Sequence, residues 1–420
     1  MPGGGFWSLW TATVVSRLGD ALRTPALALL AASASRDPRT AAAVVVAGQL
    51  PPLLFGLVGG VYADRWDRRR AMATMDGLRA ALVAGLALLV ATGDAGIAVL
   101  VGCAFLLATL GTVFDAAAFA LLPGIVPADR LAAANGRLQA GTAVAGGFVG
   151  APLAGVLFAI SAALPFAVDA VTFALAALLA LTLRVPRGLR TGPTRSSAAA
   201  TGRGATAGRG ATAWRAAGDG LRWIWRDGTL RRITLLTAIT NLATSGLIAI
   251  IVLYALEVLA VPAAGYGLFM SAAILGALTG GLCAGRVAAR LGTLAGLRCV
   301  LVVETLALVA LALARHPVPG AVALAVFSAG TAIWNALWSA YGQKNVPAAL
   351  LGRVGSAQRT VGMLAAPVGA VGAGFLGSAA GLPSVLYAAA AVFALVTAAS
   401  WHTLRSGARR DSRFSGVTGS

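Results

Sequence analysis

Long apolar runs, separated by short polar or glycine-rich connections, cover most of the chain. An apolar helix needs about 20 residues to cross a hydrocarbon core of about 30 Å. Twelve runs reach that length, and they lack the alternation of apolar and polar residues that is typical of barrel strands. The pattern therefore predicts an all-α integral membrane protein with twelve transmembrane helices. The runs are 6–32, 41–62, 71–92, 96–122, 131–159, 161–183, 231–258, 264–286, 293–314, 318–342, 355–379 and 382–404.

The composition strengthens this prediction. Of 420 residues, 58% are hydrophobic and 11% are charged, and the mean hydropathy is +0.84. A soluble domain would carry about 25% charged residues. Both an ordinary soluble protein and a disordered chain are therefore excluded, and the lipid bilayer is the expected surrounding.

The basic residues indicate an orientation. The net charge is +19, but the 33 Lys and Arg residues lie between apolar runs instead of on one soluble face, so nucleic acid is not expected as a partner. Short cytoplasmic loops of membrane proteins collect Arg and Lys. With the N-terminus inside, the outer loops hold only Arg36, Arg39 and Arg315. We expect a multi-pass protein of a bacterial inner (plasma) membrane with both termini cytoplasmic.

The cysteines and histidines suggest no chemistry of their own. Cys103, Cys283 and Cys299 lie inside apolar runs, and His316 and His402 are far apart in sequence. We expect neither a disulfide framework, nor a metal site, nor a cofactor. The sequence also lacks His-Glu-x-x-His, Gly-x-Ser-x-Gly and a phosphate loop, so an enzyme is not expected. The N-terminus lacks the basic region and cleavage site of a signal peptide, and the first run is kept as a span.

The longest connection divides the chain into two halves of six spans. Its Gly/Ala/Thr/Arg stretch is typical of a flexible linker. In the part that follows, Trp214, Leu221 and Trp225 share one helical face beside several arginines, which favours an interfacial helix on the inner leaflet over a cytosolic connector. The predicted domains are the N-terminal half at 1–184, the linker at 185–230, the C-terminal half at 231–404 and a cytoplasmic tail at 405–420.

The two halves repeat each other. Four short matches occur in the same order, at offsets of 219 to 221 residues. A parallel repeat of six-helix halves is a transporter architecture, with the substrate site near the midplane between the repeats. A duplicated scaffold without transport is the alternative. The matches are 59–60 with 280–281, 77–79 with 296–298, 111–112 with 330–331, and 126–128 with 346–348.

The connection between the second and third spans reads Gly-Gly-Val-Tyr-Ala-Asp-Arg-Trp-Asp-Arg-Arg-Arg at 59–70. It resembles the signature loop of the major facilitator superfamily, Gly-x-x-x-Asp-Arg-x-Gly-Arg-Arg. Asp67 occupies the usual second glycine position, where a left-handed conformation is tolerated by Asp better than by most residues. The alternative is a plain positive-inside anchor. The resemblance implies an inner-gate motif at Gly60, Asp64, Arg65, Arg68, Arg69 and Arg70.

The fifth span carries a second motif. Residues 146–155 read Gly-Gly-Phe-Val-Gly-Ala-Pro-Leu-Ala-Gly and are similar to the Gly-Pro motif of the family's antiporters, with one inserted Ala. Close helix packing alone is the alternative. Segments 16–20 and 220–227 resemble the branch that contains siderophore, macrolide and multidrug exporters. The antiporter-like motif comprises Gly146, Gly150, Pro152 and Gly155.

Acidic residues inside the predicted spans indicate function, because each costs about 2.5–3.5 kcal/mol on insertion scales. Glu257 lies at an outer helix end, where it is solvated. The resemblance implies that the first and fourth spans of each half line the cavity, which lowers the rank of Asp169 and Glu304. Asp20 and Asp115 remain as the predicted proton-coupling residues.

The repeat adds a contrast. Asp20 corresponds to Asn241 and Asp115 to Asn335, so the same positions are acidic in one half and neutral in the other. A carboxyl group in a low-dielectric cavity can load and release protons, which suits antiport by alternating access. A structural ion pair of Asp20 with Arg17, and a helix–helix hydrogen bond of Asp115, are the alternatives.

An aromatic pair completes the predicted site. Trp334 and Trp338 are four residues apart and share one helical face. Such a pair suits planar, amphipathic or cationic ligands, although interface anchoring or core packing explains it equally well. The predicted substrate-binding residues are Arg17, Asn241, Trp334, Asn335 and Trp338.

The resulting expectation is a monomeric exporter of the major facilitator superfamily. It would use the proton gradient to expel an amphipathic small molecule, such as a drug, a siderophore or a secondary metabolite. An uptake symporter on the same fold and a non-transporting scaffold or receptor are the two alternatives.

Overall fold

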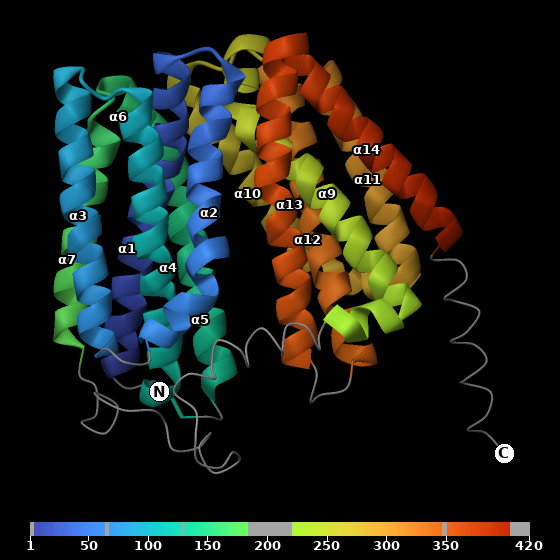
Figure 1. Ribbon diagram of the computed structural model, residues 1–420, viewed down its shortest axis with the longest axis horizontal. Helices are drawn as coiled ribbons and strands as arrows, with labels where there is room; N and C mark the ends of the chain where they lie inside the picture. The colour runs from blue at the N-terminus through green and yellow to red at the C-terminus, as the bar shows by residue number, and fades with distance from the viewer. Residues whose placement is uncertain (1–3, 64–66, 128–129, 184–220, 347–350, 404–420) are drawn as a thin grey trace. The chain divides into compact units, whose positions relative to one another are not determined.

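The computed structural model describes residues 4–63, 67–127, 130–183, 221–346 and 351–403, and every element assigned there is helical (Figure 1). When the interrupted helices are counted as one each, the described part holds twelve long helices, which confirms the predicted all-α fold of two pseudo-symmetric six-helix halves. Ten of them satisfy length and hydropathy criteria for crossing a membrane. The first helix carries Arg17, Asp20 and Arg23 within seven residues, which lowers the mean hydropathy of this segment.

The elements follow the predicted runs closely. In the first half they are α1 (Gly4–Ala34), α2 (Pro38–Ala63), α3 (Arg68–Thr92), α4 (Ile97–Ile125), α5 (Leu131–Ala143), the π-helix η2 (Val144–Gly150), α6 (Ala151–Ile160) and α7 (Leu164–Thr182). In the second half they are α9 (Gly228–Leu253), the π-helix η5 (Tyr254–Val258), α10 (Ala263–Leu291), α11 (Thr293–Leu313), α12 (Pro317–Asn345), α13 (Leu351–Ala380) and α14 (Leu382–Thr403).

The chain forms two compact units. The first comprises residues 1–36, 43–210 and 262–271, so it contains α1, α3 to α7, most of α2 and the start of α10. The second comprises residues 37–42, 211–261 and 272–420. Within the first unit α3 packs on α4 and α7, and α7 packs on α1; within the second α11 packs on α12 and α14, and α14 packs on α9. The same pairing in both units is what a duplicated bundle requires.

Apolar side chains fill each bundle. In the first unit, Phe6, Met72 and Phe114 form one buried cluster, and Val83, Leu100 and Phe173 belong to another. Many large apolar side chains elsewhere stay exposed, such as those on α7 and α11. An exposed apolar surface of this kind is expected where lipid is the solvent.

The segment before α9 is described only from residue 221 onwards. Residues 221–226 are helical, and Ile224 is buried in a cluster with Leu230 and Val346, while Leu221 and Trp225 are exposed. Most of the linker, including Trp214, lies outside the described residues, as does all of the tail. The interfacial position therefore stays a prediction, as do the domain boundaries.

Candidate functional site

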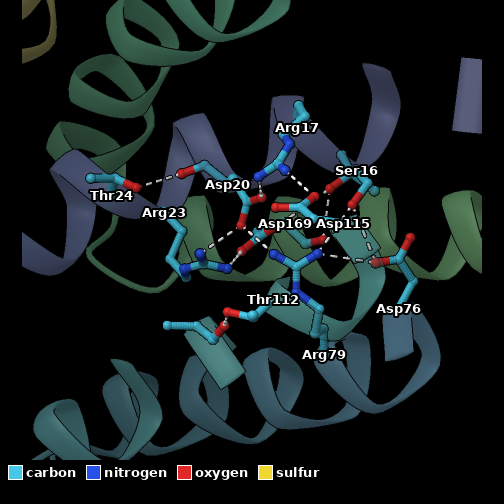
Figure 2. Close-up of polar contacts among 12 residues, drawn as sticks. Ser16, Arg17, Asp20, Arg23, Thr24, Asp76, Arg79, Thr112, Asp115 and Asp169 are labelled. Carbon is cyan, nitrogen blue, oxygen red and sulfur yellow. Dashed lines mark hydrogen bonds and ion pairs between the residues drawn. The ribbon is translucent and has the colours of Figure 1, made fainter. Parts of the chain in front are cut away.

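A network of seven ionisable side chains lies inside the first unit (Figure 2). At its centre is Asp20 of α1. Its Oδ1 accepts hydrogen bonds from Nη2 of Arg23 and Nη2 of Arg79, each at 2.6 Å, and its Oδ2 lies 3.2 Å from Nη1 of Arg17. Three guanidinium groups from two helices therefore share one carboxylate.

Each of these arginines also contacts a second acid. Arg17 pairs with Asp115 of α4, and Nη1 of Arg23 lies 3.4 Å from Oδ2 of Asp169 on α7. Nη1 of Arg79 lies 3.1 Å from Oδ1 of Asp76, which is one turn earlier on α3. The network thus joins α1, α3, α4 and α7 through alternating charges, and four carboxylates face three guanidinium groups. Such pairing offsets the cost of placing charges in an apolar interior.

Burial divides the network into a closed and an open side. The side chains of Asp76 and Asp169 are fully buried and that of Arg79 is 2% exposed. The side chain of Asp115 is 50% exposed, and that of Arg17 is 35% exposed. The open side is therefore the ion pair that water, protons or a ligand can reach.

Aromatic rings and polar groups complete the closed side. The Arg79 guanidinium lies over the Phe173 ring, 4.1 Å from its centroid, and its Nη1 donates to Oγ of Ser16 at 3.2 Å. Oγ of Ser16 in turn donates to Oδ1 of Asp76 at 3.2 Å. Oγ1 of Thr172 lies 3.4 Å from Oδ1 of Asp169.

Two glycines make room for this packing. A Cβ atom on Gly19 would collide with Oδ1 of Asp169 and Oγ1 of Thr172, so only glycine lets α7 approach α1 here. A Cβ atom on Gly111 would lie 3.3 Å from Nη2 of Arg79. Backbone positions that read as ordinary small residues in the sequence therefore shape the charged site.

Three members of the network were missed by sequence reasoning. Asp76 and Arg79 lie in the third span and Arg23 in the first, and the only signal was their presence inside apolar runs. Asp169 was ranked low because the family's sixth span is peripheral, yet it is fully buried against Arg23. The ion pair of Asp20 with Arg17, named as an alternative, is present and is one of three.

The signature loop is partly described, since Asp64 and Arg65 lie outside the described residues. Asp67 does not adopt the left-handed conformation that we considered for the glycine position; its φ is −60° and its ψ is 108°. Instead it is the N-cap of α3, and its Oδ1 accepts from the backbone N–H of Arg69 at 3.1 Å and of Arg70 at 3.4 Å. The acid thus replaces a turn residue with a helix cap.

The basic residues of that loop bind helix ends in the first unit. Nη1 of Arg68 donates to the backbone oxygen of Ala120 at 2.8 Å, near the end of α4. Nη2 of Arg69 donates to the backbone oxygen of Leu181, at the end of α7. Cations are favoured at helix C-termini, so these arginines fasten the ends of two helices. Gly60 lies within α2.

The antiporter-like motif coincides with a change of helix type. Residues 144–150 form the π-helix η2, and Pro152 is the second residue of α6, which follows it directly. A Cβ atom on Gly150 would collide with that of Ala21, the neighbour of Asp20, and one on Gly155 would lie 2.5 Å from the backbone oxygen of Ala264. A Cβ atom on Gly146 would lie 3.9 Å from that of Ala21. The motif thus brings an irregular helix against α1 beside the charged network.

The predicted substrate contacts lie in the second unit, apart from Arg17. Trp334 is buried, and its Nε1 donates to Oγ1 of Thr237 on α9 at 3.2 Å. Trp338 packs against the cluster around Ile224, whereas Asn335 is exposed. A Cβ atom on Gly362 would lie 2.8 Å from Nδ2 of Asn241, so this amide faces α13.

The fold and the family that the chain matches define a multi-pass membrane transporter. The family model of the Major Facilitator Superfamily matches residues 9–370, and the chain belongs to this superfamily. An uncharacterised MFS-type transporter of Mycobacterium tuberculosis is 33% identical over 149 residues, which is 35% of this chain and 33% of that protein. The chain thus matches about a third of the length of this curated relative.

Solved structures share the fold at low identity. A bacterial homologue of the human lysosomal transporter Spinster, in an inward-facing and unoccupied conformation, has a TM-score of 0.72 at 14% identity, over 96% of both chains. The nucleoside transporter NupG, as a D323A mutant, has a TM-score of 0.73 at 12% identity, over 95% of this chain and 100% of that one.

Proposed function

We propose that this protein exports an amphipathic small molecule in exchange for protons by alternating access. One observation carries the proposal: Asp115 is half exposed, and its partner Arg17 also binds Asp20. A charged pair at the open side of a membrane-embedded network is a place where a proton and a ligand can compete. In this proposal Asp115 carries the proton. Asp20, which we expected from the sequence to carry protons as well, is held as a carboxylate by three guanidinium groups and is the second partner of Arg17.

The proposed exchange follows from charge balance. A proton on Asp115 neutralises its carboxylate and removes the attraction to Arg17. Arg17 then keeps Asp20 as its partner, and the side of its guanidinium that bound Asp115 becomes available to the substrate. Loss of the proton restores the pair. Two charge states of one cavity thus correspond to two affinities for the substrate, which is what coupling requires.

Supporting observations concern the surroundings of Asp20. The π-helix η2 and Pro152 pack against α1 at Ala21, next to this acid. π-helical turns are frequent at functional sites, because they loosen the regular hydrogen-bond ladder. In the proposal, a change in the Asp20 network shifts the packing of α1 on η2. Asp64, Arg65 and the arginines at 68–70 control the inner gate, and Asn241, Asn335 and Trp338 contact the substrate.

The test uses inside-out membrane vesicles with an imposed proton gradient. Cationic dyes, macrolides and siderophores are added in turn, and collapse of the gradient is followed by a pH-sensitive dye. We expect collapse with at least one compound for the wild type and its loss for Asp115→Asn. Asp115 has one described ion-pair partner and is half exposed, so this variant is expected to fold.

Two controls sharpen the result. Asp94→Asn changes an exposed acid in the connection between α3 and α4 and is expected to transport at the wild-type rate. Asp20→Asn is expected to abolish transport as well, provided that its correct insertion is verified. Accumulation of the compound in right-side-out vesicles, driven by a gradient that is acidic outside, would contradict export and indicate an uptake symporter. Collapse that persists in Asp115→Asn would refute the coupling role.

A further inference from the structure

A groove of about 570 Å³ lies between α1 and the α5–η2 segment of the first unit. Trp7, Trp10 and Val14 line it from α1, and Gly141 and Val144 line it from the other side. Arg137 is its one charged lining residue. Its volume falls in the range of small-molecule sites, about 300–1,000 Å³.

The indole wall of the groove is held in place by specific contacts. The rings of Trp7 and Trp10 meet edge to face at 5.8 Å, and Nε1 of Trp10 donates to the backbone oxygen of Arg137 at 3.0 Å. A Cβ atom on Gly141 would lie 2.7 Å from the Trp10 ring, so glycine is what lets this indole lie on α5. The groove is therefore an ordered feature of the packing of α1 on α5.

Arg137 differs from the arginines of the network. Its guanidinium lies 6.0 Å from the centroid of the Trp7 ring and is exposed. Arg17, Arg23 and Arg79 each bind two carboxylates, whereas no ion pair joins Arg137 to an acid in the described part of the chain. A guanidinium on an apolar groove is a site for a carboxylate or a phosphate, which it binds through paired N–H groups.

The groove has one charged end and one apolar end. Trp7 and Arg137 stand near the first turns of α1 and α5, which the predicted orientation places at the inner leaflet. Val144 and Val149 of η2 continue the lining farther along the chain from Arg137, and both are about half exposed. From Arg137 to Ala143 the α-helix rises about 9 Å, at about 1.5 Å per residue, and the π-helix η2 extends the wall to Val149. This length suits an extended hydrocarbon chain below a headgroup.

We propose that this groove binds an anionic phospholipid of the inner leaflet. Its phosphate contacts the Arg137 guanidinium, the indole of Trp7 flanks the headgroup, and one acyl chain lies along Val144 and Val149. Cytoplasmic leaflets carry anionic lipids, which supplies the matching charge at this depth. The proposal does not depend on the substrate or the direction of transport.

The test measures tryptophan quenching in the full-length protein. The protein is placed in phosphatidylcholine bilayers that contain equal mole fractions of either brominated phosphatidylglycerol or brominated phosphatidylcholine. We expect brominated phosphatidylglycerol to quench more strongly. The excess is expected to disappear in Trp7→Phe/Trp10→Phe, although seven of the nine tryptophans remain. Equal quenching by the two lipids in the wild type would overturn the proposal.

Variants of the arginine separate charge from shape. Arg137→Gln is expected to lower the relative affinity for phosphatidylglycerol about tenfold, or about 1.4 kcal/mol. Arg137→Lys keeps the charge and is expected to retain most of the preference. Arg298→Gln is the matched control, because this guanidinium also faces an indole, that of Trp401 at 5.3 Å, but lies in the second unit. An unchanged preference in Arg137→Gln would overturn the proposal.

A soluble competitor tests the identity of the ligand. Laurate is an amphipathic anion that is not a phospholipid. If laurate relieves the Trp7- and Trp10-dependent quenching, but phosphatidylglycerol shows no preference over phosphatidylcholine, the groove takes a free amphipathic anion and the lipid proposal fails. Size-exclusion chromatography of each variant verifies that the protein is folded.

Discussion

The two units share the same helix pairing but differ in the charged side chains that they bury and in the partners of those side chains. In the first unit, Gly111 of α4 makes room for the Arg79 guanidinium from α3. In the second, Gly330 of α12 occupies the corresponding position, and a Cβ atom there would lie 2.5 Å from Cγ of Glu304 on α11. Oγ1 of Thr331 donates to Oε1 of Glu304 at 2.9 Å. The duplicated glycine is retained, while the side chain beside it ends in a guanidinium group in the first unit and in a carboxyl group in the second.

The partners of these groups differ as well. Arg79 is embedded among Asp20, Asp76 and the Phe173 ring, whereas its counterpart Arg298 lies against Trp401. The counterparts of Asp20 and Asp115 are the amides Asn241 and Asn335. Small residues therefore set the helix spacing in both bundles. Among the described residues, an ion-pair network that joins several helices is present in the first bundle.

The largest effect is expected for Asp20→Asn. Three guanidinium groups would lose their shared carboxylate, and removal of one partner from a buried charge network costs about 3–5 kcal/mol. The equivalent change in the second unit, Asn241→Ala, is expected to cost about 1 kcal/mol or less. Thermal unfolding of the purified proteins in detergent measures both. Equal shifts of the melting temperature would contradict the comparison.

The second effect concerns the duplicated arginines. Arg79→Gln leaves Asp76 and Asp20 without this partner and is expected to cost about 3 kcal/mol. Arg298→Gln loses a contact with an indole and is expected to cost about 1 kcal/mol. Adding Asp76→Asn to Arg79→Gln is expected to recover part of the loss, by at least about 1 kcal/mol of coupling. Additive losses in this double-mutant cycle would show that the pair is not coupled.

The third effect tests the glycines that both bundles share. Gly330→Ala places a Cβ atom 2.5 Å from Cγ of Glu304, a buried stem, and overpacking of this kind costs about 1–3 kcal/mol. Gly111→Ala places one 3.3 Å from Nη2 of Arg79, a contact that a shift of a few tenths of an ångström relieves. We expect the second change to cost under about 1 kcal/mol. The order of the two melting temperatures decides the matter.

The smallest effect is expected for Glu304→Gln. The amide keeps the volume of the side chain and an oxygen that accepts the hydrogen bond of Thr331, and no ion pair of Glu304 is present in the described residues. We expect a change under about 1 kcal/mol in the same melting experiment. The same acid-to-amide change thus separates the two units, and a loss as large as that of Asp20→Asn would place Glu304 in a charge network.

Much of the fold could be read from the chain because lipid imposes strong rules. Apolar runs of about 20 residues, basic loops and the repeat are local or periodic signals, and the observed helices follow them. The site was only partly predictable. Asp20 and Asp115 were identified as acids on cavity-lining spans. Asp76 and Arg79 lie inside the third span, but which charges they meet depends on how α3 packs against α1. Asp67 was considered as a turn residue, since a helix cap depends on where the backbone turns.

The membrane class, the number and length of the helices, the duplication and the presence of costly charges in the first half follow from the amino-acid sequence alone. Those properties follow from the free energy of single segments in lipid, which each segment carries in its own residues. Only the tertiary structure decided which charges pair, because Asp20, Arg79, Asp115 and Asp169 come from four helices and meet through packing. The tertiary structure also shows that Gly19 and Gly141 leave room for neighbouring side chains, since a glycine's role depends on what approaches it.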